Sequence, residues 1–82
     1  MPHQEIEGKV REQIARIAKI EPSFDAAKDI FRELGVKSAQ ALDLLLSLED
    51  EFGVQISDDK FGEARTTVQI VELIAALRGE AA

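Results

Sequence analysis

Apolar residues recur every three or four positions in three segments of the 82-residue chain, which is the spacing of amphipathic helices. The first segment predicts a helix over residues 4–20. Its apolar stripe consists of Ile6, Val10, Ile14 and Ile17. We expect this helix to end at Pro22, because the residue before a proline disfavours the helical conformation.

The second segment predicts a helix over Ser38–Phe52, with Gly53 as its stop. The third predicts a helix that begins at a capping box, Thr66 with Gln69 three residues later, and that is closed by Gly79. The apolar face of this last helix consists of Ile70, Val71, Ile74 and Leu77.

A short helix is predicted around Phe61, and Gly62 limits it. Ser57 is a preferred N-cap residue, and the helix dipole favours the acids that follow it, Asp58 and Asp59, in a first helical turn. This short helix lies between the second and third long ones.

Residues 21–37 form a long first connection, in which we expect a helical turn near residues 26–33. Its apolar side chains should hold it against the core: Phe24, Ile30, Phe31 and Leu34. The nearest approach to strand alternation, residues 53–56, is too short to build a sheet. The pattern therefore predicts an all-α single domain over residues 1–82, a small four-helix bundle with three main helices, one short helix and a long first loop.

The composition excludes several kinds of catalytic machinery. The chain has no Cys, and therefore no disulfide, thiolate nucleophile or Cys-based zinc site of its own. The single His, His3, lies at an N-terminus that we expect to be frayed, so a Ser-His-Asp arrangement lacks its base. The acids around Asp58 do not match a calcium loop. We therefore expect no metal site, and a protein that is not an enzyme by itself.

The formal net charge is −6, and all of it lies in the second half of the chain. Residues 1–37 hold seven acidic and seven basic residues, whereas residues 38–82 hold nine and three. This balance disfavours nucleic acid and anionic membrane surfaces, because binding to either requires clustered Lys and Arg. The chain has no long apolar run, no signal-peptide pattern and no large third apolar face, so we expect a soluble, cytoplasmic monomer without membrane insertion.

The second long helix has two apolar stripes. The stripe predicted to face the core consists of Ala41, Leu44, Leu45, Leu48 and Phe52. The other face holds Leu42, Leu46 and Glu49 and is bordered by Asp43 and Asp50. This face is either an ordinary solvated surface or a docking strip, whose leucines make contact and whose acids steer basic partners. The nearness of the serine at the helix start favours docking.

Ser38 itself has two interpretations. Serine is a preferred N-cap residue, because its hydroxyl accepts a hydrogen bond from the second or third helical N–H. The alternative is that the hydroxyl carries a phosphate ester, since free N–H groups and the positive end of the helix dipole stabilise an anion there. A catalytic nucleophile is excluded, because no side chain is placed to activate it.

Residues 33–56, ELGVKSAQALDLLLSLEDEFGVQI, resemble the core signature of the acyl carrier protein family. The family pattern is a loop ending in Gly-x-Asp-Ser-Leu, then a leucine-rich helix with Glu-Glu-Phe near its end. An Ile-Pro-Asp turn follows, which is here Ile56-Ser57-Asp58. The resemblance covers nearly the whole chain and implies a four-helix carrier.

The resemblance also implies a cofactor and partners. Ser38 would receive 4′-phosphopantetheine from coenzyme A through a phosphopantetheinyl transferase, and the thiol would hold acyl groups as thioesters for loading ligases, synthases and acyltransferases. Carried over by position, the docking residues are Leu42, Asp43, Leu46, Glu49 and Asp50, with Ile56 near the arm. The acyl chain would lie between the second helix and the rest of the bundle. The candidate lining residues are Leu48, Phe52 and Ile74.

Three positions depart from the family pattern. The Asp and Leu that flank the serine are Lys37 and Ala39 here, and the usual acid two residues after it is Gln40. The Asp normally helps to engage a basic transferase. We therefore expect the standard fatty-acid-synthesis enzymes to recognise this carrier poorly, and the protein to serve a specialised lipid or secondary-metabolite pathway. Alternatively, Lys37 pairs with the attached phosphate.

Two further functions stay open. One is a carrier of the same fold that accepts an aminoacyl group from an adenylating ligase. The other is a helical adaptor that is not modified and only binds partners.

Overall fold

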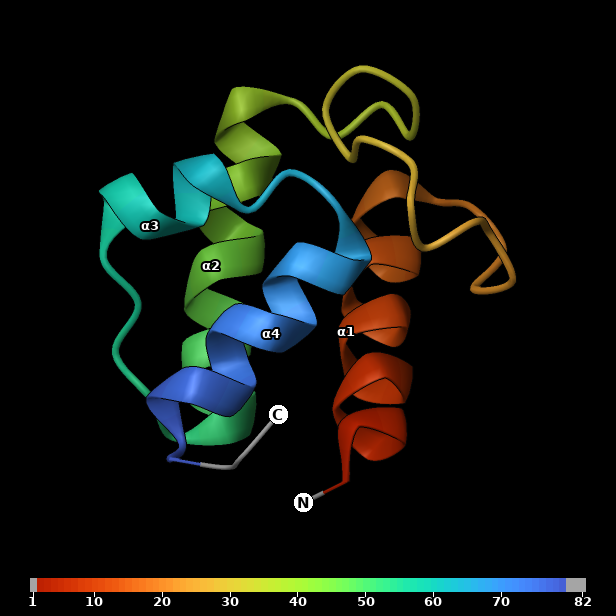
Figure 1. The fold of residues 1–82 in the computed structure, drawn as a ribbon. Helices are drawn as coiled ribbons and strands as arrows, with labels where there is room; N and C mark the ends of the chain where they lie inside the picture. The colour runs from red at the N-terminus through yellow and green to blue at the C-terminus, as the bar shows by residue number, and fades with distance from the viewer. Residues whose placement is uncertain (1, 80–82) are drawn as a thin grey trace.

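The computed structural model describes residues 2–79, which form four helices: α1 (His3–Ala18), α2 (Ser38–Phe52), α3 (Asp58–Glu63) and α4 (Thr67–Leu77). In Figure 1 the long first loop arcs from α1 to the start of α2, and the short α3 lies beside that same end of α2. The predicted all-α fold, with three main helices and one short one, is confirmed.

The core forms where α1 packs against both α2 and α4. Each of these helices contributes the apolar stripe predicted from its spacing. The large apolar side chains that are fully buried are Ile6, Val10, Ile14, Ile30, Leu44, Leu48, Ile70 and Ile74. Leu77, the last residue of α4, was predicted on the core face but is 43% exposed.

Both predicted N-caps after α2 are present. The Ser57 hydroxyl accepts a hydrogen bond from the Lys60 N–H at 3.2 Å and starts α3. The Thr66 hydroxyl accepts from the Gln69 N–H at 3.1 Å and starts α4. Gly62 does not stop α3, which continues to Glu63, because a glycine costs a helix only about 1 kcal/mol relative to alanine.

The first helix differs from its predicted bounds at both ends. It ends at Ala18, because Lys19 adopts the left-handed conformation (φ 59°) and its N–H donates to the Ala15 carbonyl. Pro22 therefore lies beyond the helix and does not end it. The N-terminus was predicted to fray, but His3 is the first residue of α1 and is half-buried.

The long connection between α1 and α2 contains two hydrogen-bonded turns near the predicted place. The Lys28 N–H donates to the Asp25 carbonyl at 3.1 Å, and the Glu33 N–H donates to the Asp29 carbonyl at 2.9 Å. The first part of this connection is held to α1 by Arg11. The Arg11 guanidinium donates to the carbonyls of Pro22 and Phe24 and lies 5.0 Å from the centroid of the Phe24 ring. A loop with few backbone hydrogen bonds of its own thus gains partners for two carbonyls from a helix side chain.

The part of the chain that the structure describes holds neither a membrane-spanning helix nor a group of metal ligands. None of the helices within residues 2–79 is long and apolar enough to cross a membrane. Across the same residues, no three His, Asp or Glu side chains are grouped as ligands of a metal ion.

The two stripes of α2 give a direct test of this packing. Leu44 is fully buried and Leu46 is 54% exposed, although both are leucines of one helix. We expect Leu44→Ala to lower the free energy of unfolding by about 2–5 kcal/mol, because it leaves a cavity in the core. Leu46→Ala should change it by only about 0.5 kcal/mol or less. Urea unfolding of both variants measures the difference, and equal losses would contradict the assignment of the two faces.

Candidate functional site

Ser38 begins α2, and its side chain is exposed. Lys37 precedes it at the N-cap position in an extended conformation (φ −90°, ψ 164°), and the Lys37 N–H donates to Gln40 Oε1 at 2.9 Å. The interpretation of Ser38 as the N-cap is therefore wrong, because Ser38 is already helical. Within residues 2–79, the Ser38 hydroxyl has no hydrogen-bond partner.

Gln40 has a structural role that the sequence analysis missed. Besides accepting from Lys37, its side-chain amide donates to the Ile17 carbonyl near the end of α1, at 3.2 Å. Gln40 thereby ties the start of α2 to α1. An acid at this position, as the family pattern has it, has no N–H to donate to that carbonyl.

The first turn of α2 leaves backbone donors free. The Ala41 N–H is the first to bond back along the chain, to the Lys37 carbonyl at 2.8 Å. Among the described residues, the N–H groups of Ser38, Ala39 and Gln40 have no acceptor. Together with the helix dipole they make the surroundings of the serine favourable for an anion.

A groove of about 270 Å³ opens beside Ser38. Three elements form its lining: the long loop, the first half of α2, and α3. The lining residues other than Ser38 are Phe31, Ala41, Leu42, Leu45, Asp58, Phe61 and Gly62. Apart from Ser38 and Asp58, these residues offer no polar side chain, so the groove suits an apolar group.

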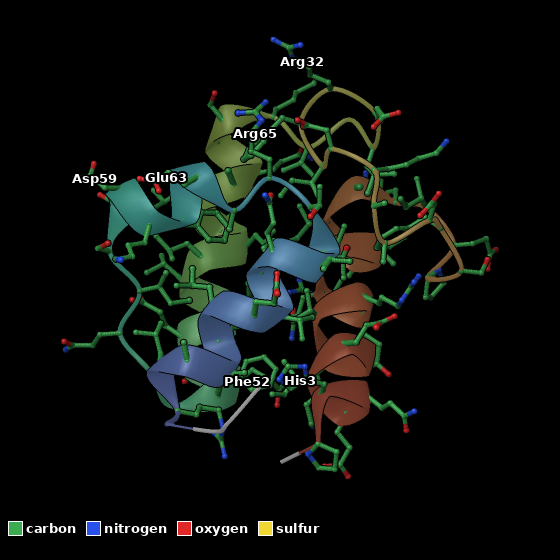
Figure 2. All side chains as sticks on the ribbon, in the orientation of Figure 1. His3, Arg32, Phe52, Asp59, Glu63 and Arg65 are labelled. Atoms are coloured by element: carbon green, nitrogen blue, oxygen red, sulfur yellow. The ribbon has the colours of Figure 1, made fainter. Side chains whose placement is uncertain are left out.

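The three residues predicted to line an acyl pocket do not line this groove. Leu48, Phe52 and Ile74 are all buried in the core between the main helices. In Figure 2, Phe52 and Arg65 lie in opposite halves of the molecule. The groove forms instead where α3 and the long loop leave space beside the start of α2.

The predicted docking strip is largely an exposed face. Leu42 and Leu46 are 56% and 54% exposed, and Asp43 and Asp50 beside them are exposed as well. Leu42 also lines the groove. The strip therefore continues from the middle of α2 to the mouth of the groove at Ser38.

Glu49 and Ile56 lie differently from the other predicted docking residues. Glu49 is half-buried, and its Oε2 accepts a hydrogen bond from the Ile56 N–H at 2.8 Å. Ile56 is only 5% exposed and belongs to the core. This contact holds the connection between α2 and α3 against α2, so it fixes where α3 begins.

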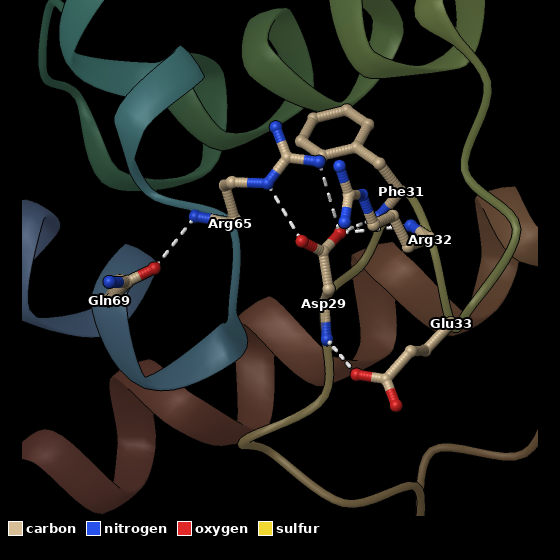
Figure 3. Close-up of polar contacts among 6 residues, drawn as sticks. All are labelled: Asp29, Phe31, Arg32, Glu33, Arg65 and Gln69. Carbon is tan, nitrogen blue, oxygen red and sulfur yellow. Dashed lines mark hydrogen bonds and ion pairs between the residues drawn. The ribbon is translucent and has the colours of Figure 1, made fainter.

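The wall of the groove formed by the long loop is held by one ion pair, shown in Figure 3. Arg65 Nε lies 2.7 Å from Asp29 Oδ2, and the guanidinium lies 4.9 Å from the centroid of the Phe31 ring. The other carboxylate oxygen of Asp29 accepts the N–H of Phe31 at 2.8 Å and that of Arg32 at 2.9 Å. One carboxylate thus joins the loop to the connection between α3 and α4.

These hydrogen bonds lower the pKa of the Asp29 carboxyl group. The hydrogen bond from the Arg65 side chain, followed by that from the Arg32 N–H, lowers the pKa of Asp29 from 3.8 to about 2. Both donors favour the charged carboxylate over the neutral acid.

Sequence reasoning placed Phe31 and Phe61 only as apolar side chains of the loop and the short helix. The ion pair between Asp29 and Arg65 was not predicted, because the two residues lie 36 positions apart and no local spacing joins them. The fold alone brings these four side chains to one end of the molecule.

Known proteins are similar to this chain in both sequence and fold. Residues 8–78 match the family model described as a phosphopantetheine attachment site. An acyl carrier protein of Trieres chinensis is 33% identical over 72 residues, which cover 87% of this chain and 85% of that protein. A solved acyl carrier protein from Enterococcus faecalis, described as highly thermostable, is similar with a TM-score of 0.80 and 29% identity, over 94% of this chain and 99% of the other.

The lowered pKa of Asp29 predicts how acid affects the fold. A depressed carboxylate pKa contributes stability above its unfolded value, and that contribution is lost as the pH falls from about 4 towards 2. Asp29→Asn lacks the charge, so the stability difference between wild type and variant should shrink over that range. Urea midpoints at pH 6, 4 and 2.5 measure it. A difference that does not change with pH would contradict the role of the charged pair.

Proposed function

This chain belongs to the acyl carrier protein family, whose members are carriers rather than enzymes, and from that premise we propose that Ser38 carries the 4′-phosphopantetheine arm. The observation that supports this most is the exposed Ser38 hydroxyl, which has no hydrogen-bond partner within residues 2–79. It lies at the start of α2 and at the mouth of an apolar groove.

The residues around Ser38 suit a phosphate diester. The free N–H groups of the first turn and the positive end of the helix dipole favour its charge. The chain has no sulfur nucleophile of its own, because it contains no Cys. When bound, the arm supplies the thiol that holds an acyl group as a thioester.

The groove supports acyl groups as the cargo. Each methylene that leaves water for an apolar lining contributes about 0.8 kcal/mol. A volume of about 270 Å³ lies just below the ~300–1,000 Å³ of typical small-molecule pockets. Short and medium acyl chains are therefore the cargo that this groove shelters best.

One observation favours the aminoacyl alternative. Asp58 lies in the lining of the groove, where its carboxylate is placed to pair with the ammonium of an aminoacyl group. The mass of the loaded protein isolated from its host distinguishes the two cargoes. An acyl mass supports the main proposal, and an aminoacyl mass supports the alternative.

The exposed face of α2 is proposed as the surface that partners contact. Leu42 and Leu46 supply apolar anchors, and Asp43 and Asp50 attract basic groups on the partner. The partners proposed are a phosphopantetheinyl transferase, and the loading ligases, synthases and acyltransferases that use the thioester. An exposed strip that leads to the groove lets such enzymes reach Ser38 without unfolding the core.

Lys37 is proposed to set which of these enzymes recognise the carrier. It places a positive charge, exposed to solvent, directly before Ser38, where the family pattern has an acid. A partner with a basic surface is repelled there, which supports service in a specialised pathway rather than in standard fatty-acid synthesis. In the alternative role, the exposed Lys37 side chain contacts the phosphate attached to Ser38.

Modification of Ser38 is tested by mass. After incubation with coenzyme A and a broad-specificity phosphopantetheinyl transferase, we expect the wild type to gain one phosphopantetheine and Ser38→Ala to gain none. Ser47→Ala, on the same helix, is the matched control and should be modified like the wild type. No gain in the wild type with several transferases would favour the unmodified adaptor, and a gain in Ser38→Ala would place the arm elsewhere.

The role of Lys37 is tested by reversing its charge. Steering by charge changes association rates by ~10–1,000-fold, so we expect Lys37→Asp to be modified about tenfold faster by a housekeeping transferase at low salt. Malonyl transfer by a housekeeping enzyme should rise in the same direction, and Lys37→Gln should lie between the two proteins. If Lys37→Asp is modified and acylated no differently, the idea of specialised partners fails.

A further inference from the structure

Two loop phenylalanines are each covered by an arginine, but only one of them lines the groove. Arg11 lies over Phe24, and Arg65 lies over Phe31, at 5.0 and 4.9 Å from the ring centroids. Phe31 is part of the groove lining beside Ser38, whereas Phe24 is not. The Phe31 ring is therefore a wall of the groove supplied by the long loop.

The position of this wall is fixed by contacts from outside the groove. Arg65 is held by the Asp29 carboxylate on one side and by the Phe31 ring on the other. The same carboxylate accepts the Phe31 N–H, so ring and backbone are anchored to one acid. An aspartate is ionised at neutral pH, so the ion pair between Asp29 and Arg65 is present there.

Two backbone hydrogen bonds also hold this part of the loop, one to the connection after α3 and one within the loop itself. The Ile30 N–H donates to the Arg65 carbonyl at 2.8 Å, and the Val36 N–H donates to the Ile30 carbonyl at 2.9 Å. Ile30 is fully buried. The loop around Phe31 is thus tied to the connection after α3 and, through Val36, to the start of α2.

We propose that Phe31, held by Arg65 and Asp29, is the specificity-determining wall that limits the length of the acyl group sheltered beside Ser38. This inference rests on the proposed function, in which Ser38 bears the acyl arm. The groove is small, and the guanidinium over the Phe31 ring, itself paired with the Asp29 carboxylate, favours the position in which the ring lines the groove on the loop side. The wall therefore favours short and medium straight acyl chains over long ones. Arg65 and Asp29 are positioning residues, because they act through the ring.

The proposal is tested with an acyl series of increasing length, loaded on the holo-protein. For each chain length we compare acyl and holo forms of one protein by melting temperature and by the rate of thioester cleavage with hydroxylamine. In the wild type, protection should stop increasing at a medium length. In Phe31→Ala it should continue to longer chains, and one further sheltered methylene slows cleavage about fourfold.

Matched variants separate this role from general stability. Phe24→Ala removes the other arginine-covered ring, and Arg32→Gln removes an exposed arginine next to the wall. Both should keep the wild-type length limit. Arg65→Gln and Asp29→Asn should move it towards longer chains, by less than Phe31→Ala does, because the ring remains but is no longer held.

The outcomes are distinct. If Phe31→Ala does not fold, Phe31→Leu and Arg65→Gln carry the test. An unchanged length limit in the folded variants overturns the proposal while leaving the carrier function intact, since their intact mass still shows the arm. If the wild-type protein takes up no phosphopantetheine arm, the proposed function is wrong. The proposal for Phe31, which rests on that function, is then wrong as well.

Discussion

Helix α2 packs against α1 through one side only, and the position of Ser38 and of the exposed face of α2 depends on this one-sided burial. Leu44 and Leu48 are fully buried, whereas Leu42 and Leu46, two positions before each of them, point to solvent. A helix of this length gains its stability mainly from the apolar face that it buries. The buried face holds α2 in place, and the opposite face and the first turn with Ser38 stay exposed to solvent.

The long loop poses a second physical problem, because a segment with few helical hydrogen bonds needs other partners for its backbone. Arginines from outside the loop and one aspartate within it provide them. Arg11 bonds the carbonyls of Pro22 and Phe24, and Arg65 pairs with Asp29, whose carboxylate in turn accepts two loop N–H groups. These polar contacts are partly exposed and weak one by one. Their main effect is on the position of the loop, because they hold the loop and its phenylalanines in place relative to α2 and α3.

The helices and their buried faces followed from local rules. Apolar spacing identified the three main helices, and the caps at Ser57 and Thr66 were confirmed. Errors arose where a local rule met a competing one. Lys19 in the left-handed conformation ended α1 before Pro22 had any influence, and Gln40 from within the helix, rather than Ser38, capped the start of α2. In both cases one backbone conformation or one side-chain hydrogen bond decided where the helix ends or begins. The spacing of apolar residues does not specify either of them.

The sequence by itself determined a small acidic helical domain, because the helical periodicity and the charge can be read from the chain directly, and the motif around Ser38 gave its resemblance to the acyl carrier protein family. It also determined the exposed strip on α2, since the helical period alone separates Leu42 and Leu46 from the buried stripe. Only the tertiary structure decided where the groove lies. Phe31 and Phe61 come from the loop and from α3 to line the groove beside α2, and an ion pair between residues 36 positions apart lies next to Phe31. Contacts of that kind are set by how the helices pack, and no spacing along the chain specifies them.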